Sequence, residues 1–209
     1  MRIFIAMVLF SMSSWASVDA IVGKRFPTRG RFELALFPLD FSVAEPFVAQ
    51  PYALHGTAGY HIFDWFAVEV YGGYVPVSGE TDILAQVRHA LVNAEPQLSR
   101  MWQTSYFAGA NLQWAPLYGK LSLLSLCETH VQLYVLVGGG VDGIRKMQVL
   151  QNQYAYSVQG ALNVGAGVRI FLADFAALRL EWRDDFRQNP GESGIIGTNW
   201  LQFGVGFFL

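Results

Sequence analysis

Residues 200–209 read WLQFGVGFFL, a stretch that contains no charged side chain. Side chains alternate between the two faces of a β-strand. One face of this stretch therefore carries Leu201, Phe203, Val205, Phe207 and Leu209. An exposed apolar strand edge promotes aggregation, whereas a closed barrel has no free edge and places such a row against lipid. The stretch predicts the last strand of a transmembrane β-barrel.

The opposite end of the sequence has the pattern of a secretory signal peptide. A basic start is followed by an apolar run over residues 3–10 and by small residues that permit cleavage after Ala16 or Ala20. The apolar run is too short to cross the hydrocarbon core of a bilayer, which is about 30 Å thick. We expect residues 1–20 to be a signal peptide and residues 21–209 to form the exported barrel domain.

The composition agrees with a membrane barrel. The chain is 53% hydrophobic and 14% charged, whereas soluble domains are about 25% charged. Past residue 20, no stretch has the roughly 20 apolar residues of a membrane helix. A net charge of −2 gives no reason to expect nucleic acid as a partner. The single cysteine, Cys127, excludes an internal disulfide framework.

Eight segments have the alternation of tilted membrane strands, which are about ten residues long. They cover residues 30–41, 51–62, 65–77, 102–114, 129–141, 157–171, 175–187 and 198–209. Short connections alternate with long ones, apart from residues 115–128 between the fourth and fifth segments. The sequence predicts an all-β fold, an eight-stranded antiparallel up-and-down transmembrane β-barrel with its long loops outside the cell.

Alternation along these segments separates an apolar face from a charged face. An Arg or Lys at the bilayer midplane on the lipid side costs about 2–4 kcal/mol, so the charged face must line the lumen. We expect an ion-pair network in a narrow lumen, formed by Glu33, Glu69, Arg169, Arg179, Glu181 and Arg183. The alternation alone also fits a soluble sandwich or a lipocalin-like barrel whose apolar face points inward.

Candidate chemistry in the charged face is weak. Glu69, Glu181 and Arg179 contain the paired carboxylates of an acid/base site, although structural ion pairing explains them better. His55 and His61 share a strand face but lie about 20 Å apart at strand spacing, so they cannot share a metal. No spacing links a serine to a histidine as nucleophile and base. We expect no enzymatic activity, no cofactor and no metal.

The longest predicted connection, residues 78–101, contains an apolar stripe at helical spacing that includes Ile83, Leu84 and Val87. One interpretation is an extracellular amphipathic segment that covers the barrel mouth or binds an envelope or extracellular protein. The other is a loop that folds against the barrel rim without a specific partner.

The chain resembles the small outer-membrane β-barrel domains of Gram-negative bacteria, the group of OmpA- and OmpX-type barrels. The resemblance covers roughly residues 29–209 and is carried by the turn Phe63-Asp64-Trp65, the charged stretch 179–184 and the closing strand 201–209. It implies an outer-membrane location among outer-membrane lipids. It also implies that the barrel assembly machinery reads the closing strand, in which Leu209 replaces the favoured final Phe or Trp.

These features predict an integral outer-membrane barrel with a plugged, ion-paired lumen and a structural or interaction role through its extracellular loops. The main alternative is a narrow passive channel for small solutes. A lipid-modifying barrel enzyme and a soluble ligand-binding barrel are two further alternatives.

Overall fold

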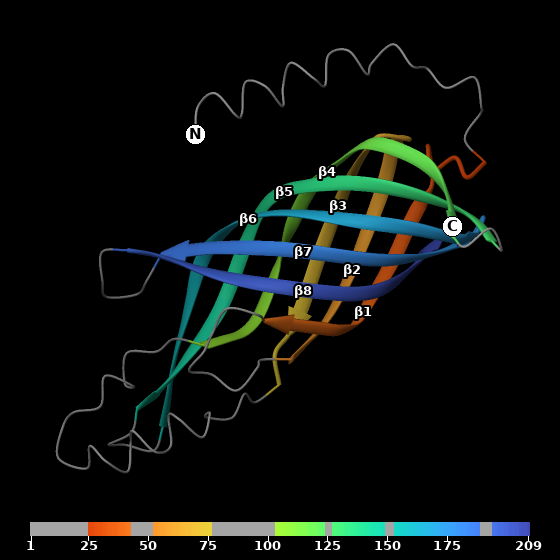
Figure 1. Ribbon diagram of the computed structural model, residues 1–209. Coiled ribbons are helices and arrows are strands. Elements are labelled where there is room, and N and C mark those ends of the chain that lie inside the picture. The colour runs from red at the N-terminus through yellow and green to blue at the C-terminus, as the bar shows by residue number, and fades with distance from the viewer. Residues whose placement is uncertain (1–24, 43–51, 77–102, 124–126, 149–152, 189–193) are drawn as a thin grey trace, which may run out of the picture.

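The computed structural model describes residues 25–42, 52–76, 103–123, 127–148, 153–188 and 194–209. These residues form a closed barrel in which each strand pairs antiparallel with the next and the first pairs with the last (Figure 1). The strands are β1 (Phe32–Ser42), β2 (Tyr52–Phe63), β3 (Phe66–Tyr74), β4 (Gln103–Leu123), β5 (Cys127–Gln148), β6 (Gln153–Ala173), β7 (Ala176–Gln188) and β8 (Ile195–Phe208). The predicted eight-stranded up-and-down barrel is confirmed. The predicted signal peptide and the connection 78–101 lie outside the described residues.

The closing strand β8 lies between β7 and β1 and completes the ring. Val205 pairs with Leu178 of β7 and with Leu36 of β1. Phe203 and Phe207 are exposed on the outer surface together with the partly exposed Val205, while Gly204 and Gly206 face the interior. The apolar row that the sequence predicts for the last strand is therefore the outer face of the seam.

The barrel has an apolar exterior and a polar interior. Large apolar side chains stand exposed along the strands, for example Leu36 at 65% and Val137 at 54%. Asn163, Arg169 and Arg183 are fully buried on the opposite face. Charged side chains are almost never fully buried unless they are paired, so this arrangement is the reverse of a soluble barrel. The described residues contain no helix long and apolar enough to cross a membrane.

The prediction of a long connection at residues 115–128 is wrong. β4 continues to Leu123 and β5 begins at Cys127, so most of this stretch is a paired β-ribbon. The pairing is offset between Trp114 and Leu117. Pro116 lies in this irregularity, where its missing N–H interrupts the ladder without ending it. The proline therefore marks a bulge in a strand and not the start of a loop.

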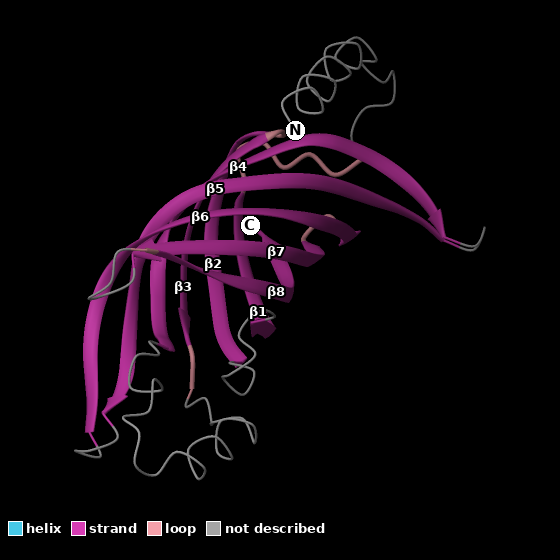
Figure 2. Cartoon of the chain, turned by 60° about the vertical axis from the view of Figure 1, so that its left-hand side comes forward, coloured by secondary structure: helices cyan, strands magenta, loops and turns pink. Residues whose placement is uncertain are grey.

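The connection predicted at residues 142–156 is likewise mostly strand. β5 runs to Gln148 and pairs there with Gln153 at the start of β6. β7 pairs with β6 only as far as Ala161, so β5 and β6 extend beyond β7 at the long-loop end of the barrel. Figure 2 shows the long strands running past their neighbours at both ends of the barrel.

Candidate functional site: the barrel interior

Alternate positions of β1, β3, β6 and β7 carry the charged side chains that the sequence predicts for the interior. All six predicted network residues are buried: Glu33, Glu69, Arg169, Arg179, Glu181 and Arg183. The strand period explains the placement, because every second side chain of β7 points inward. Burial of a charge is costly unless the group is paired and hydrogen-bonded. The partners of these groups therefore decide what the interior can do.

Arg179 is the most connected of these residues. Its Nη1 donates to Glu69 Oε2 at 2.8 Å, and its Nη2 donates to Glu181 Oε2 at 2.8 Å. Its Nε donates to the hydroxyl of Tyr134 at 3.1 Å, and that hydroxyl donates to Glu181 Oε2 at 2.8 Å. Every guanidinium nitrogen thus has an acceptor, and two of the acceptors are carboxylates.

Arg169 binds Glu33 through two nitrogens, from Nη2 to Oε2 at 2.6 Å and from Nε to Oε1 at 3.3 Å. His61 Nε2 lies 2.9 Å from Glu33 Oε2, and Gln132 Oε1 accepts a further hydrogen bond from Arg169. Glu33 Oε1 also lies 3.6 Å from Arg179 Nη1, which joins the two groups. The structure therefore brings five predicted residues into one cluster, here called the central network: Glu33, Glu69, Arg169, Arg179 and Glu181.

Arg183 lies outside the central network. Its guanidinium stacks over the rings of Tyr71 and Phe107, with its Cζ 4.6 Å and 5.1 Å from the two ring centroids. Its Nε is 3.4 Å from Asp185 Oδ1, but none of its three nitrogens has a hydrogen-bond partner among the residues that the structure describes. Sequence reasoning placed Arg183 with Arg179 because the two share a strand face. Arg183 lies four positions beyond Arg179 along β7, and this distance places its guanidinium over aromatic rings and away from the acids of the central network.

Two clusters of buried apolar residues lie on either side of the central network. The long-loop cluster consists of Ala53, Tyr71, Val75, Phe107 and Trp200. The short-turn cluster consists of Phe26, Phe171, Ala177 and Phe208, with Tyr118 packed against it. The inward side chains of β7 show the order of the three groups along the barrel. Ala177 belongs to the short-turn cluster, and the next two, Arg179 and Glu181, belong to the central network. Arg183 follows and stacks on the long-loop cluster.

Residues 25–31, which precede β1, cross the short-turn end of the barrel. The ring of Phe26 stacks on that of Phe171 at 5.3 Å between centroids, and Phe26 N donates to the Tyr118 hydroxyl at 3.3 Å. The backbone N–H groups of Thr28 and Arg29 donate to Asp64 Oδ1 at 2.8 Å and 2.9 Å. The turn aspartate thus anchors the segment that precedes β1.

The fold is similar to that of three solved membrane barrels at low sequence identity. The N-terminal β-barrel domain of OprF from Pseudomonas aeruginosa matches with a TM-score of 0.56 and 11% identity, over 87% of this chain and 98% of that chain. Neisserial surface protein A matches with 0.53 and 14%, over 85% and 96%. Ail, the attachment invasion locus protein of Yersinia pestis, matches with 0.50 and 12%, over 87% and 99%. The chain has the fold of a small outer-membrane β-barrel.

The predicted resemblance to small outer-membrane barrels is confirmed at the level of fold. No protein-family model and no curated protein sequence matches the chain.

Sequence reasoning missed an ion pair at the long-loop end of the outer-membrane barrel. Arg187 Nη1 donates to Asp142 Oδ2 at 3.2 Å and to Thr104 Oγ1 at 2.8 Å. Arg187 lies four residues after Arg183 and therefore on the same face of β7, so the alternation predicts that Arg187 also points inward. Its partner Asp142 lies just beyond the predicted strand segment 129–141, so the sequence predicts a loop there and gives no face for this residue. Tyr134 was also missed, because a tyrosine at an inward position carries no charge signal.

Two of the buried histidines, His55 and His61, have separate partners. His61 contacts Glu33 in the central network, whereas His55 Nδ1 lies 3.0 Å from Gln202 Nε2. The part of the chain that the structure describes contains no group of three or more His, Cys, Asp or Glu residues arranged to hold a metal ion. What the geometry of the described interior offers is ion pairing and ring stacking.

Proposed function

We propose that the chain is an integral outer-membrane protein with a plugged lumen and a structural or interaction role, exercised by its surfaces at the long-loop end. The observation that carries this proposal is the reversed distribution of polarity, with exposed Leu and Val outside and fully buried arginines inside. Such an apolar exterior is stable in contact with lipid, whereas in water it would promote aggregation. A catalytic role has no part in the proposal.

Export and insertion follow the features that the sequence predicts. Residues 1–20 serve as the signal peptide, with cleavage after Ala16 or Ala20. The outward row of β8, Leu201, Phe203, Val205, Phe207 and Leu209, is the segment offered to the barrel assembly machinery. Outer-membrane lipids then surround the apolar exterior.

Packing of the interior supports a plugged lumen. The central network fills the middle of the barrel, and an eight-stranded barrel has room for side chains and little more. On one side of the network, three rings pack together: Phe26, Phe171 and Phe208. On the other side, the ring centroids of Phe107 and Trp200 lie 5.8 Å apart. A solute crossing the barrel would have to displace both aromatic clusters and separate the ion pairs.

An interaction role is supported by the β5–β6 extension. These two strands continue past β7 at the long-loop end, and the extension exposes Tyr156 at 71% and Val158 at 58%. The predicted partner-binding connection, residues 78–101, begins at the same end, after β3. We propose that an envelope or extracellular protein binds this end of the barrel.

A pair of valine substitutions tests the membrane location. Val137→Arg should lower the free energy of unfolding by about 2–4 kcal/mol, because Val137 lies midway along β5 on the outer face. Val158→Arg, near the long-loop end, should cost at most about 1 kcal/mol. Urea unfolding of barrels refolded in lipid vesicles measures both values.

The control is the wild-type chain on a detergent gel with and without boiling, together with membrane fractionation. A folded barrel in the outer-membrane fraction should shift its mobility on heating. A soluble, heat-insensitive protein in which both valine variants are as stable as wild type would refute the membrane proposal.

The plugged lumen predicts silence in electrical recordings. Wild-type protein inserted in planar bilayers should give no stable conductance steps, because ion pairs of the central network cross the lumen and an aromatic cluster lies on either side of them. Insertion is checked by the heat-dependent gel shift of the recovered protein. Regular steps whose size changes in Glu181→Gln would instead establish a narrow channel.

A further inference from the structure

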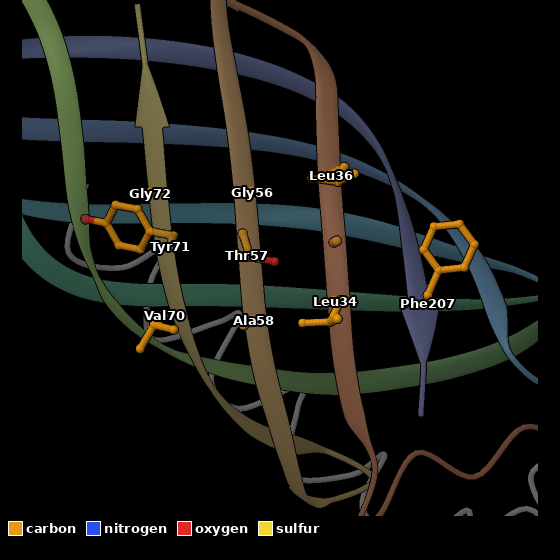
Figure 3. A pocket seen from close by; sticks show the side chains of 10 residues that line it. Leu34, Leu36, Gly56, Thr57, Ala58, Val70, Tyr71, Gly72 and Phe207 are labelled. Carbon is orange, nitrogen blue, oxygen red and sulfur yellow. The ribbon is translucent and has the colours of Figure 1, made fainter.

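The outer surface of the barrel contains a hollow over β1, β2 and β3 (Figure 3). Its volume is about 650 Å³. Its outward lining residues are all apolar: Leu34, Leu36, Gly56, Ala58, Val70 and Gly72. Phe207 of β8 also borders it. Small outward residues of β2 and β3 thus form the floor of the hollow, and larger apolar side chains of β1, β3 and β8 border it.

Packing inside the barrel does not require the glycines of this hollow. A Cβ at Gly56 would lie 3.5 Å from Leu36 Cδ2, and a Cβ at Gly72 would lie 3.7 Å from the carbonyl oxygen of Phe107. Both are ordinary contacts. By contrast, a Cβ at the inward-facing Gly109 would lie 2.5 Å from the Tyr71 hydroxyl. The hollow is therefore a property of the outer surface and not a by-product of the interior.

A cation lies at the short-turn end of the same strands. The guanidinium of Arg29 lies 5.8 Å from the ring centroid of Phe63, the last residue of β2, and the Arg29 side chain is exposed. Arg31 is occupied, because it donates to the carbonyl oxygens of Asp174 and Phe208. Within the described residues the guanidinium of Arg29 has no carboxylate partner, although the backbone N–H of Arg29 donates to Asp64. An aromatic ring with an arginine beside it is typical of the level of lipid headgroups.

The distance between this cation and the hollow matches the depth of one leaflet. β2 runs seven residues from Gly56 to Phe63, or about 23 Å at strand spacing. At a strand tilt of about 40° this is about 18 Å along the membrane normal. Half of the hydrocarbon core is about 15 Å. The cation and the hollow therefore lie at the heights that the headgroup and the acyl chains of one leaflet occupy.

We propose that the hollow and Arg29 form a binding site for one anionic glycerophospholipid of the leaflet at the short-turn end. The phosphate, whose charge is not offset by an ammonium group of the same headgroup, pairs with Arg29, and an acyl chain fills the space over Gly56 and Gly72. The inference rests on the proposed membrane location, because only there do lipids surround this surface. It goes beyond that location by assigning one lipid class to one place on the barrel.

Native mass spectrometry of the refolded full chain tests the site. Protein released from detergent micelles containing dioleoyl phosphatidylglycerol should keep one lipid. The retained fraction should fall roughly tenfold in Gly56→Leu, which fills the hollow. It should fall about fivefold in Arg29→Gln, which removes one cation near a lipid surface. Dioleoyl phosphatidylcholine, which has the same acyl chains, should be retained no better by wild type than by Arg29→Gln.

The matched control is Gly160→Leu. Gly160 is also an exposed strand glycine, with no atom within 4 Å of an added Cβ, but it lies on β6 away from the hollow. This variant should retain phosphatidylglycerol as wild type does. Ala58→Leu fills the hollow from a second position and should behave as Gly56→Leu, which guards against a folding defect in either one.

Equal loss of lipid in Gly160→Leu and Gly56→Leu would overturn the site, as would equal retention of the two lipids by the wild-type chain. Failure of the membrane proposal has a different signature, because the wild-type protein would then show no heat-dependent gel shift in any detergent. The gel is therefore run on every variant before lipid retention is compared.

Discussion

Arg179→Met is expected to lower the free energy of unfolding by about 3–5 kcal/mol, the range measured when one partner of a buried ion pair is removed. Arg179 lies 2.8 Å from a carboxylate oxygen of Glu69 and 2.8 Å from one of Glu181. Its loss leaves both acids buried without their cation. Urea unfolding in lipid vesicles, followed by the heat-dependent gel shift, gives the difference from wild type.

A variant without the whole group provides the decisive comparison. In Arg179→Met combined with Glu69→Leu and Glu181→Leu, no unpaired charge remains, so the triple variant should be more stable than Arg179→Met alone. Lys120→Met removes an exposed charge of β4 and should leave stability unchanged. If Arg179→Met unfolded at the same urea concentration as Lys120→Met, the central network would not contribute to the stability of the barrel.

The architecture could be predicted from the sequence because the two faces of each strand differ so strongly. β8 shows this best, because its outward row and its pairing with β1 both follow from one alternating stretch. The assignment of Arg169 and Arg179 to the lumen follows from the cost of placing a charge in lipid. Such rules depend on which face a residue occupies, and alternation fixes the face.

The ends of β4, β5 and β6 could not be predicted, because the signals that usually end a strand are weak in a paired ribbon. Pro116 sits in an irregularity of β4, and the ladder resumes at Leu117. Asp142 lies inside the barrel opposite Arg187, although an aspartate usually favours a turn. Pairing with a neighbouring strand overrides both local preferences.

The partners of the interior charges could not be predicted either. Alternation gives the face of a residue but not its height relative to strands that are distant in sequence. Arg183 was grouped with the acids and instead stacks on Tyr71 and Phe107. Phe26 gave no strand signal, yet it packs against Phe171. These contacts depend on the stagger of the strands around the barrel.

A glycine run in β5 explains how β4 and β5 approach so closely. Gly140 pairs with Gly109, and Gly138 pairs with Asn111. A Cβ at Gly140 would collide with the carbonyl oxygen of Ala108 and would lie 2.7 Å from Gly109 Cα. Both obstacles are backbone atoms, so no side-chain rotation relieves the clash. The run Gly138-Gly139-Gly140 therefore has a structural role in the wall of the barrel.

Gly140→Ala should consequently destabilise the barrel by about 3 kcal/mol, at the upper end of the cost of overpacking a close contact. The two strands must separate or shift register to admit one methyl group. Gly160→Ala, where an added Cβ meets no atom within 4 Å, is the matched control and should be neutral or slightly stabilising. Urea unfolding in vesicles compares the two variants directly. Equal stability of Gly140→Ala and Gly160→Ala would contradict this prediction. It would mean that β4 and β5 lie far enough apart at Gly140 to admit a side chain, so the glycine run would not be needed for their pairing.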